Sequence, residues 1–166
     1  VDWYDDKGVV RSIDHYNRQG ALYARTTFNK KGQRVNKSYF DAKGREIIME
    51  NYVTKNIILN DGDIVRIFNN KLDFVVYFFE KAGLKDHRIF FNTLSTSFFV
   101  SQRVGGEEKN DVLFWQEPKR EDIPGNMQVI LNGQSSRTSK IMVQKKDAYE
   151  KLLALGANPK MLNSLG

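Results

Sequence analysis

The sequence has no cysteine and only two histidines, His15 and His87. Without cysteine, the chain can form no disulfide, no thiolate zinc site and no cysteine nucleophile. The two histidines are too far apart in sequence to form a two-histidine metal-binding pair on one helix. We therefore expect neither a metal site nor a cofactor.

Long apolar stretches are also missing. No run approaches the ~18 residues that cross a bilayer, and no basic segment followed by an apolar one opens the chain as a secretion signal would. Only three prolines occur among 166 residues, of which 40% are hydrophobic and 28% charged, so the composition is that of a folded chain. We expect a cytoplasmic protein and, because the sequence starts at Val1 rather than Met, a fragment of a longer one.

The net charge of +6 and the pI near 9.4 raise the question of nucleic-acid binding. Residues 1–52 contain ten Lys and Arg against seven Asp and Glu, and residues 53–166 contain sixteen against thirteen, so the excess is spread evenly. Binding to phosphate backbones requires cations gathered on one surface. We therefore expect no nucleic-acid partner.

An exact repeat opens the chain. Glycines recur every twelve residues at Gly8, Gly20, Gly32 and Gly44, and an aromatic residue precedes each by four positions. Asp or Asn follows each aromatic residue, which is typical of a type I turn that ends on a left-handed glycine. Each repeat is thus one strand of about eight residues and one tight turn. The pattern predicts an extended antiparallel β-meander over residues 1–68.

The predicted strands do not show one clean apolar face. Neither alternate set of side chains in 21–28 or in 33–40 is purely apolar, so both faces of the sheet should be partly solvated. Such a sheet buries too little to be stable alone, and we expect a single-layer arm held by a neighbour or a partner. Its aromatic residues either pack across strands to support the sheet or form a recognition surface. For partner contact we select Tyr16, Phe28 and Phe40.

Residues 69–166 follow a different pattern. The apolar hairpin 57–68 indicates that the sheet meets a core there, and the apolar segment 71–82 predicts a helix buried on most sides. Three short apolar runs then alternate with helical segments, which predicts parallel strands with right-handed crossovers. The runs are 88–92, 111–115 and 140–144, and the helical segments are 97–104, 125–131 and 147–155. The fold class is α+β/α/β: the meander, inserted into or preceding a partial Rossmann-like α/β domain.

No catalytic motif accompanies this α/β pattern. The glycine fingerprint of dinucleotide-binding folds and the P-loop are both absent, and the hydroxyl-rich segment 135–139 has no recognisable base beside it. Ligands of such sheets bind at the carboxyl ends of the strands. Trp115, Glu117 and Asn126 fall there and could line a crevice, although solvation of a strand end and helix capping explain them equally well.

Several segments resemble the glycosyltransferase pair of the accessory Sec system of streptococci. They are Tyr-Val-Thr at 52–54, Ile-Ile-Leu-Asn at 57–60, Leu-Phe-Trp-Gln-Glu-Pro at 113–118 and Ile-Pro-Gly-Asn-Met-Gln at 123–128. The similarity runs along essentially the whole chain and is closer to the stabilising, GtfB-type subunit than to the catalytic, GtfA-type subunit.

The resemblance implies a GT-B glycosyltransferase fold whose acceptor-side Rossmann domain carries an inserted β-sheet, and a pair of subunits that associate through these sheets. It implies a complex that transfers N-acetylglucosamine from UDP-GlcNAc to Ser and Thr of a serine-rich repeat adhesin. The stabilising subunit would hold this acceptor polypeptide without catalysing transfer. The resemblance also suggests peripheral association of the complex with the inner face of the cell membrane.

An alternative stays open, in which the chain is the acceptor-side fragment of a catalytic GT-B enzyme of the GtfA type or the wall-teichoic-acid type. A retaining enzyme of this kind needs two glutamates separated by seven residues, and no pair in this chain has that separation. We therefore expect no catalytic residue in this chain.

Overall fold

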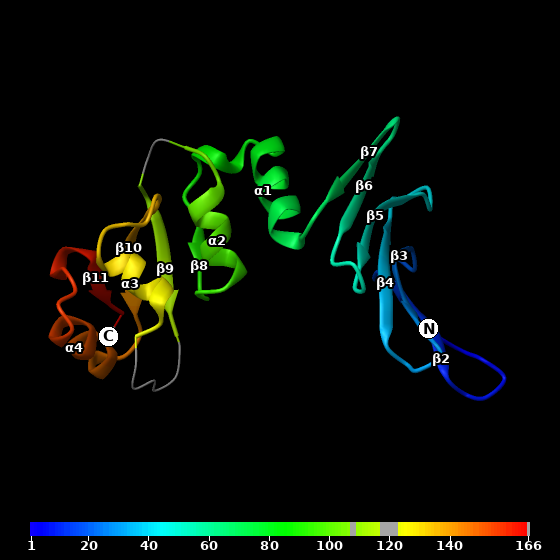
Figure 1. Cartoon of the computed structure of the whole chain (residues 1–166), viewed down its shortest axis with the longest axis horizontal. Coiled ribbons are helices and arrows are strands. Elements are labelled where there is room, and N and C mark those ends of the chain that lie inside the picture. The colour runs from blue at the N-terminus through cyan, green and yellow to red at the C-terminus, as the bar shows by residue number, and fades with distance from the viewer. Residues whose placement is uncertain (107–108, 117–122, 166) are drawn as a thin grey trace. The chain divides into compact units, whose positions relative to one another are not determined.

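A computed structural model describes residues 1–106, 109–116 and 123–165. The chain divides into two compact units, Val1–Phe74 and Val75–Gly166. Our sequence-based division lies between residues 68 and 69. Each unit is described by itself, and Figure 1 gives the element labels.

The first unit is a seven-stranded antiparallel sheet in which every strand pairs with its neighbours in sequence, β1-β2-β3-β4-β5-β6-β7. The meander predicted from the twelve-residue repeat is therefore confirmed. The repeat strands have up to seven residues rather than eight, because the turn and its flanking residue take five. The strands are β1 (Asp2–Tyr4), β2 (Val10–Tyr16), β3 (Leu22–Phe28), β4 (Arg34–Phe40), β5 (Glu46–Asn51), β6 (Ile57–Asp61) and β7 (Ile64–Phe68).

The repeated turns have the predicted chemistry, as the third repeat shows. The Gly32 amide donates to the Asn29 carbonyl at 3.0 Å, and the Asn29 side chain accepts from the amides of Lys31 and Gln33 at 2.8 and 3.0 Å. Gly32 has a φ of 72°, the left-handed conformation that glycine adopts without strain. One extra residue after each turn forms a β-bulge, for example Tyr23 opposite the step from His15 to Tyr16.

Neither face of this sheet carries a continuous apolar layer. Its buried side chains include Asp14, Thr26 and Ser38 beside Ala24 and Ile57, and most other sheet residues are half-buried. Figure 1 shows these strands as one layer. The expectation of two partly solvated faces is confirmed.

The second unit is a four-stranded parallel sheet with helices. Its strand order is β11-β10-β9-β8, so each new strand is added on the same side of the previous one. The three predicted strands are present, and β11 is an additional strand that the sequence pattern did not indicate. The elements are α1 (Lys71–Lys81), of which 71–74 belong to the first unit, the 3₁₀ turn η1 (Leu84–Asp86), β8 (Phe90–Phe91), α2 (Thr96–Arg103), β9 (Asp111–Trp115), α3 (Gly125–Leu131), β10 (Thr138–Val143), α4 (Lys146–Ala154), η2 (Pro159–Met161) and β11 (Leu162–Ser164).

One apolar cluster holds this unit together. It combines alternate residues of all four strands with one or more residues from each of α2, α3 and α4. Its members are Phe91, Leu94, Phe98, Leu113, Trp115, Met127, Ile130, Ile141, Val143, Leu152, Ala157 and Leu162. The parallel sheet with crossover helices is therefore present as predicted.

The helix α1 requires a correction. It forms where the sequence predicts a helix, but only Val76 is buried, and Phe78 is 53% exposed. The helix contributes no residue to the apolar cluster, although Phe74 packs edge-to-face on Phe68 at 5.5 Å between ring centroids. Apolar residues all round a helix indicate what it can bury, but not whether a neighbour covers it. Among the described residues, no helix has the length and apolar content required to span a bilayer.

Candidate functional site

The three aromatic residues selected for partner contact do not form one row. Asp14, Arg25 and Ser38 are paired in register across β2, β3 and β4, so they share one face of the sheet. Tyr16 and Phe40 each lie two residues beyond a member of this row, on the same face and at the same end of the sheet. Phe28 adjoins the turn at the other end and lies on the opposite face. A single partner surface can therefore contact Tyr16 and Phe40 together, but not Phe28.

A buried carboxylate stabilises the first three strands of this face. Asp14 accepts two hydrogen bonds from the Arg25 guanidinium, at 2.5 and 2.8 Å, and one from the Trp3 indole at 2.9 Å. The hydrogen bond from Arg25 lowers the pKa of Asp14 below its ordinary value, and the Trp3 hydrogen bond acts in the same direction. These contacts join β1, β2 and β3, so the sheet holds its register without an apolar layer.

The opposite face carries an amphipathic group around Glu50. The Tyr52 hydroxyl donates to Glu50 at 3.4 Å, and the Lys71 ammonium also lies 3.4 Å from that carboxylate. The Lys37 ammonium lies 5.2 Å from the centroid of the Tyr39 ring. Burial raises the pKa of Tyr39, and the charge of Glu50 raises it further, so its phenol remains a neutral donor.

The strand β7 gives the sheet an exposed apolar edge, where the sequence pattern indicated contact with a core. Ile64, Val65 and Ile67 are 51, 62 and 67% exposed, although the hairpin was expected to meet a core. Because β7 is the last strand in the sheet order, its outer edge has no neighbouring strand within the described residues. Soluble proteins usually protect such an edge with charge, a bulge or a covering segment. The edge therefore presents unused strand-pairing capacity together with apolar side chains on both faces.

In the second unit, the predicted crevice residues have different environments. Trp115 ends β9 as a buried member of the apolar cluster, and its buried indole N–H has no hydrogen-bond partner among the residues that the structure describes. Asn126, in the first turn of α3, donates from Nδ2 to the Leu94 carbonyl at 2.7 Å and so ties α3 to the loop after β8. Glu117 lies outside the described residues. Trp115 and Asn126 thus both lie near the carboxyl ends of the parallel strands, and both also have structural roles.

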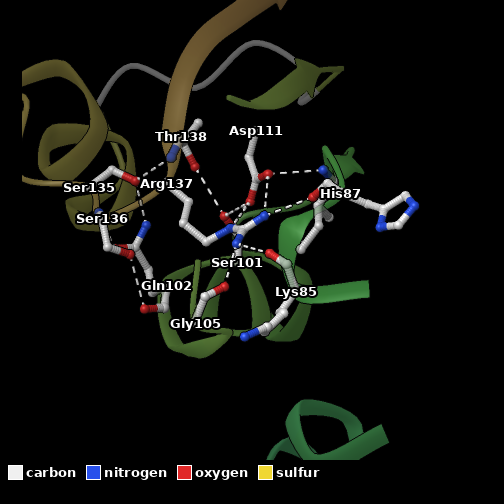
Figure 2. A network of polar contacts seen from close by, with 11 residues as sticks. Lys85, His87, Ser101, Gln102, Gly105, Asp111, Ser135, Ser136, Arg137 and Thr138 are labelled. Carbon is white, nitrogen blue, oxygen red and sulfur yellow. Dashed lines mark hydrogen bonds and ion pairs between the residues drawn. The ribbon is translucent and has the colours of Figure 1, made fainter. Parts of the chain in front are cut away.

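The most extensive polar network lies at the opposite, amino-terminal ends of β9 and β10 (Figure 2). Arg137 and Asp111 are 2% and 0% exposed, and the guanidinium donates to both carboxylate oxygens at 3.0 and 3.2 Å. Its remaining hydrogen bonds go to the carbonyls of Lys85 and Gly105, both at 2.5 Å, and of His87 at 2.8 Å. Arg137 therefore holds the segments before β8 and after α2 against the sheet.

The serine hydroxyl groups near this network also form hydrogen bonds. Ser101 donates to Asp111 at 2.8 Å, and Ser135 accepts from Gln102 at 2.5 Å and from the Thr138 amide at 2.9 Å. The hydroxyl-rich segment 135–139 thus ties the start of β10 to α2 and β9, a role that its sequence pattern did not indicate. Ligands of parallel sheets bind at the carboxyl ends of the strands, so we assign the network to stability. Within the described residues, no group of three or more His, Asp or Glu is arranged to hold a metal ion.

Two family models match the chain. The GtfB middle domain matches residues 1–69, and the GtfB third domain matches residues 71–155. The stabilising protein GtfB of UDP-N-acetylglucosamine–peptide N-acetylglucosaminyltransferase from Streptococcus agalactiae is 45% identical over 157 residues, which cover 93% of this chain and 35% of the relative. Its Streptococcus gordonii counterpart is 41% identical over 158 residues, covering 95% and 35%.

A crystal structure of a GtfA/B complex bound to UDP and GlcNAc contains a chain of similar fold. The TM-score is 0.80 at 38% identity, with 99% of this chain and 38% of that chain covered. The chain thus spans about a third of the length of the curated relatives that it matches. Because the two family models account for both structural units, the chain belongs to the GtfB family.

Proposed function

We propose that this chain is the partner-docking and acceptor-holding part of a noncatalytic subunit that stabilises a peptide N-acetylglucosaminyltransferase. The names of the curated relatives support the stabilising role. Two structural units suit two tasks: the sheet docks on a GtfA-type catalytic subunit, and the α/β unit helps to hold a serine-rich acceptor polypeptide. The complex acts in the cytoplasm in this proposal, and association with the inner face of the membrane is a separate hypothesis that vesicle flotation tests.

The exposed edge of β7 is the observation that carries the docking role. Three apolar side chains, each more than half exposed, lie on a strand whose outer edge is open in the described structure. A strand of the partner could pair with this edge and cover these side chains on both faces. Tyr16 and Phe40 would extend the contact along one face, whereas Phe28 would not reach the same surface.

The acceptor role has more limited support. Asn126 and Trp115 lie at the carboxyl ends of the parallel strands, where ligands of α/β sheets bind. The buried indole N–H of Trp115 finds no acceptor within the described part of the chain, and a hydrogen-bonding ligand would supply one. We retain Trp115, Glu117 and Asn126 as the acceptor-contact residues of the proposal.

The docking role is tested with a matched pair of variants in the full-length protein. Ile67 on the β7 edge is 67% exposed, and Val53 in the turn before β6 is 70% exposed. Burying the exposed two thirds of an isoleucine side chain is worth about 1–2 kcal/mol. Ile67→Glu also introduces a charge to be desolvated, so we expect its affinity for the catalytic subunit to fall at least about tenfold. Val53→Glu should bind as the unmodified protein does.

Binding is measured by titration with the purified GtfA-type subunit, with thermal unfolding of each variant as a folding control. Equal affinities for Ile67→Glu and Val53→Glu would contradict docking through β7. Transfer of N-acetylglucosamine by the full-length protein without its partner would contradict the noncatalytic assignment. The Tyr16→Ala and Phe40→Ala pair, compared with Phe28→Ala, then tests which face of the sheet takes part.

A further inference from the structure

The apolar edge strand β7 carries one charged residue, at its centre. Among the five residues Ile64–Phe68, this residue is Arg66, and it is exposed. Soluble proteins protect edge strands by proline, by bulges or by charge. The strand contains no proline, and its five residue pairs with β6 run without a bulge, so charge is the device that β7 itself provides. Arg66 therefore bears on which strands this edge can accept.

The first strand to consider is β7 of a second copy. Side chains directly opposite each other in an antiparallel pair lie on the same face, so a twofold-symmetric pair of strands is centred on one residue. Centred on Arg66, all five residues of each strand pair, from 64 with 68 to 68 with 64, and the two Arg66 side chains lie directly opposite each other. Like charges in that position destabilise a sheet.

A shifted register avoids this contact but loses strand pairing. Centred on either neighbour of Arg66, three of the five residues pair, 64–66 or 66–68. Both shifts also place the guanidinium opposite an apolar residue, Ile64 or Phe68. Head-to-tail pairing with the other edge of the sheet is short as well, because the strand β1 at that edge has three residues. The β7 edge is thus apolar but poorly complementary to a second copy.

We propose that Arg66 selects the partner of this edge: it disfavours pairing of two copies and favours a strand of the catalytic subunit that places Asp or Glu opposite it. This proposal rests on the docking role of β7 proposed above. Opposite charges facing each other across an antiparallel pair stabilise it, whereas the same geometry between two copies is repulsive. The other positions of the partner strand should be apolar, because Val65 and Ile67 on one face and Ile64 on the other are each more than half exposed.

Self-association of the full-length protein, measured by sedimentation equilibrium, tests the first half of the proposal. An equimolar mixture of the unmodified protein and Arg66→Glu places opposite charges face to face, which neither protein does alone. We expect the mixed pair to associate at least about tenfold more tightly than either like pair. Arg66→Val, which removes the repulsion, should also self-associate at least about tenfold more tightly than the unmodified protein.

A matched control makes the same charge change away from the edge. Arg18 is exposed in the turn between β2 and β3, and Arg18→Glu should give no gain on mixing. Adding Ile67→Glu to both members of the mixture should abolish the gain, because the contact then loses its apolar part. A mixture no tighter than its components, an equal gain with Arg18→Glu, or a gain that survives Ile67→Glu would overturn the proposal. Thermal unfolding shows that each variant is folded, and Arg66→Val alone carries this test if Arg66→Glu is not.

Titration of the same variants with the purified GtfA-type subunit tests the second half. We expect Arg66→Glu to bind at least about tenfold more weakly than Arg18→Glu, because it turns an attraction into a repulsion, and Arg66→Lys to retain most of the affinity. If Ile67→Glu weakens binding but Arg66→Glu does not, docking through β7 stands and the role of Arg66 is refuted. If neither substitution weakens binding, docking through β7 fails, and the selection of a partner strand by Arg66 fails with it.

Discussion

Replacing Arg137 by methionine should destabilise the second unit more than any surface substitution. The change removes every charge-assisted hydrogen bond to Asp111 from the guanidinium, and it leaves a carboxylate with no solvent exposure. Breaking a buried ion pair by removing one partner costs about 3–5 kcal/mol. The Ser101 hydroxyl and the Ile89 amide still donate to Asp111, so we expect a loss near the lower end, about 3 kcal/mol.

The assay is equilibrium unfolding in urea, followed by tryptophan fluorescence. The sequence has two tryptophans, Trp3 in the first unit and Trp115 in the buried cluster of the second. In a Trp3→Phe background, the signal therefore reports the second unit alone. As a control, Lys146→Met removes an exposed pair with Glu150, 3.8 Å apart, and should change stability by less than about 0.5 kcal/mol.

A double variant distinguishes an unpaired charge from a general loss of packing. Asp111→Leu together with Arg137→Met removes both charges, and such apolar replacements of buried ion pairs are often neutral. We expect the double variant to be more stable than Arg137→Met alone by at least about 1 kcal/mol. A loss below about 1 kcal/mol for Arg137→Met, or additive losses in the double variant, would refute the reasoning.

Three further predictions concern turns and ion pairs. Gly32→Val should destabilise the first unit by more than about 1 kcal/mol, because a β-branched residue resists the left-handed conformation at a φ of 72°, and unchanged thermal unfolding would contradict this. Gly106→Ala should destabilise the second unit, since its Cβ would lie 2.5 Å from Arg137 Nη1, and urea unfolding at wild-type concentration would disprove this. Asp14→Asn should cost about 1–2 kcal/mol at pH 7, after allowance for the half-exposed Arg25. Because the folded-state pKa of Asp14 lies below its ordinary 3.8, its contribution is present above that pH and is lost as pH falls further, so the difference in stability between the two proteins should shrink as the pH is lowered below 3.8.

The fold of the first unit was largely predictable because residues close together in the sequence specify its turns. Each turn is specified by an Asp or Asn and a glycine three residues later, and the fixed repeat then sets the register of the neighbouring strands. The face of the sheet on which each aromatic side chain lies was harder to predict. Tyr16 and Phe28 occupy equivalent positions in the repeat but end successive antiparallel strands, so they lie at opposite ends and on opposite faces.

The errors share a physical cause. The apolar residues of α1 and β7 indicated burial, but a pattern of hydrophobic residues carries no information about which neighbour is present to cover them. The Arg137 network was invisible for a different reason. Its two charged residues are 26 positions apart, and its other acceptors are the backbone carbonyls of Lys85, His87 and Gly105, which have no sequence signature.

The weak burial of the first unit has a consequence for the proposed docking. A sheet with two partly solvated faces gains little from its own apolar contacts, so a partner that covers β7 adds a large fraction of its stability. A partner that binds only the folded state stabilises that state, by about 2.7 kcal/mol when its concentration is a hundred times the dissociation constant. The same relation holds for each of the two proteins in a complex. If the sheet docks through β7 as proposed, the catalytic subunit should stabilise this sheet through the same contact by which the sheet stabilises the catalytic subunit. A single-layer sheet that is partly solvated on both faces leaves apolar side chains of β7 exposed on either side of its edge, and a partner strand could cover both.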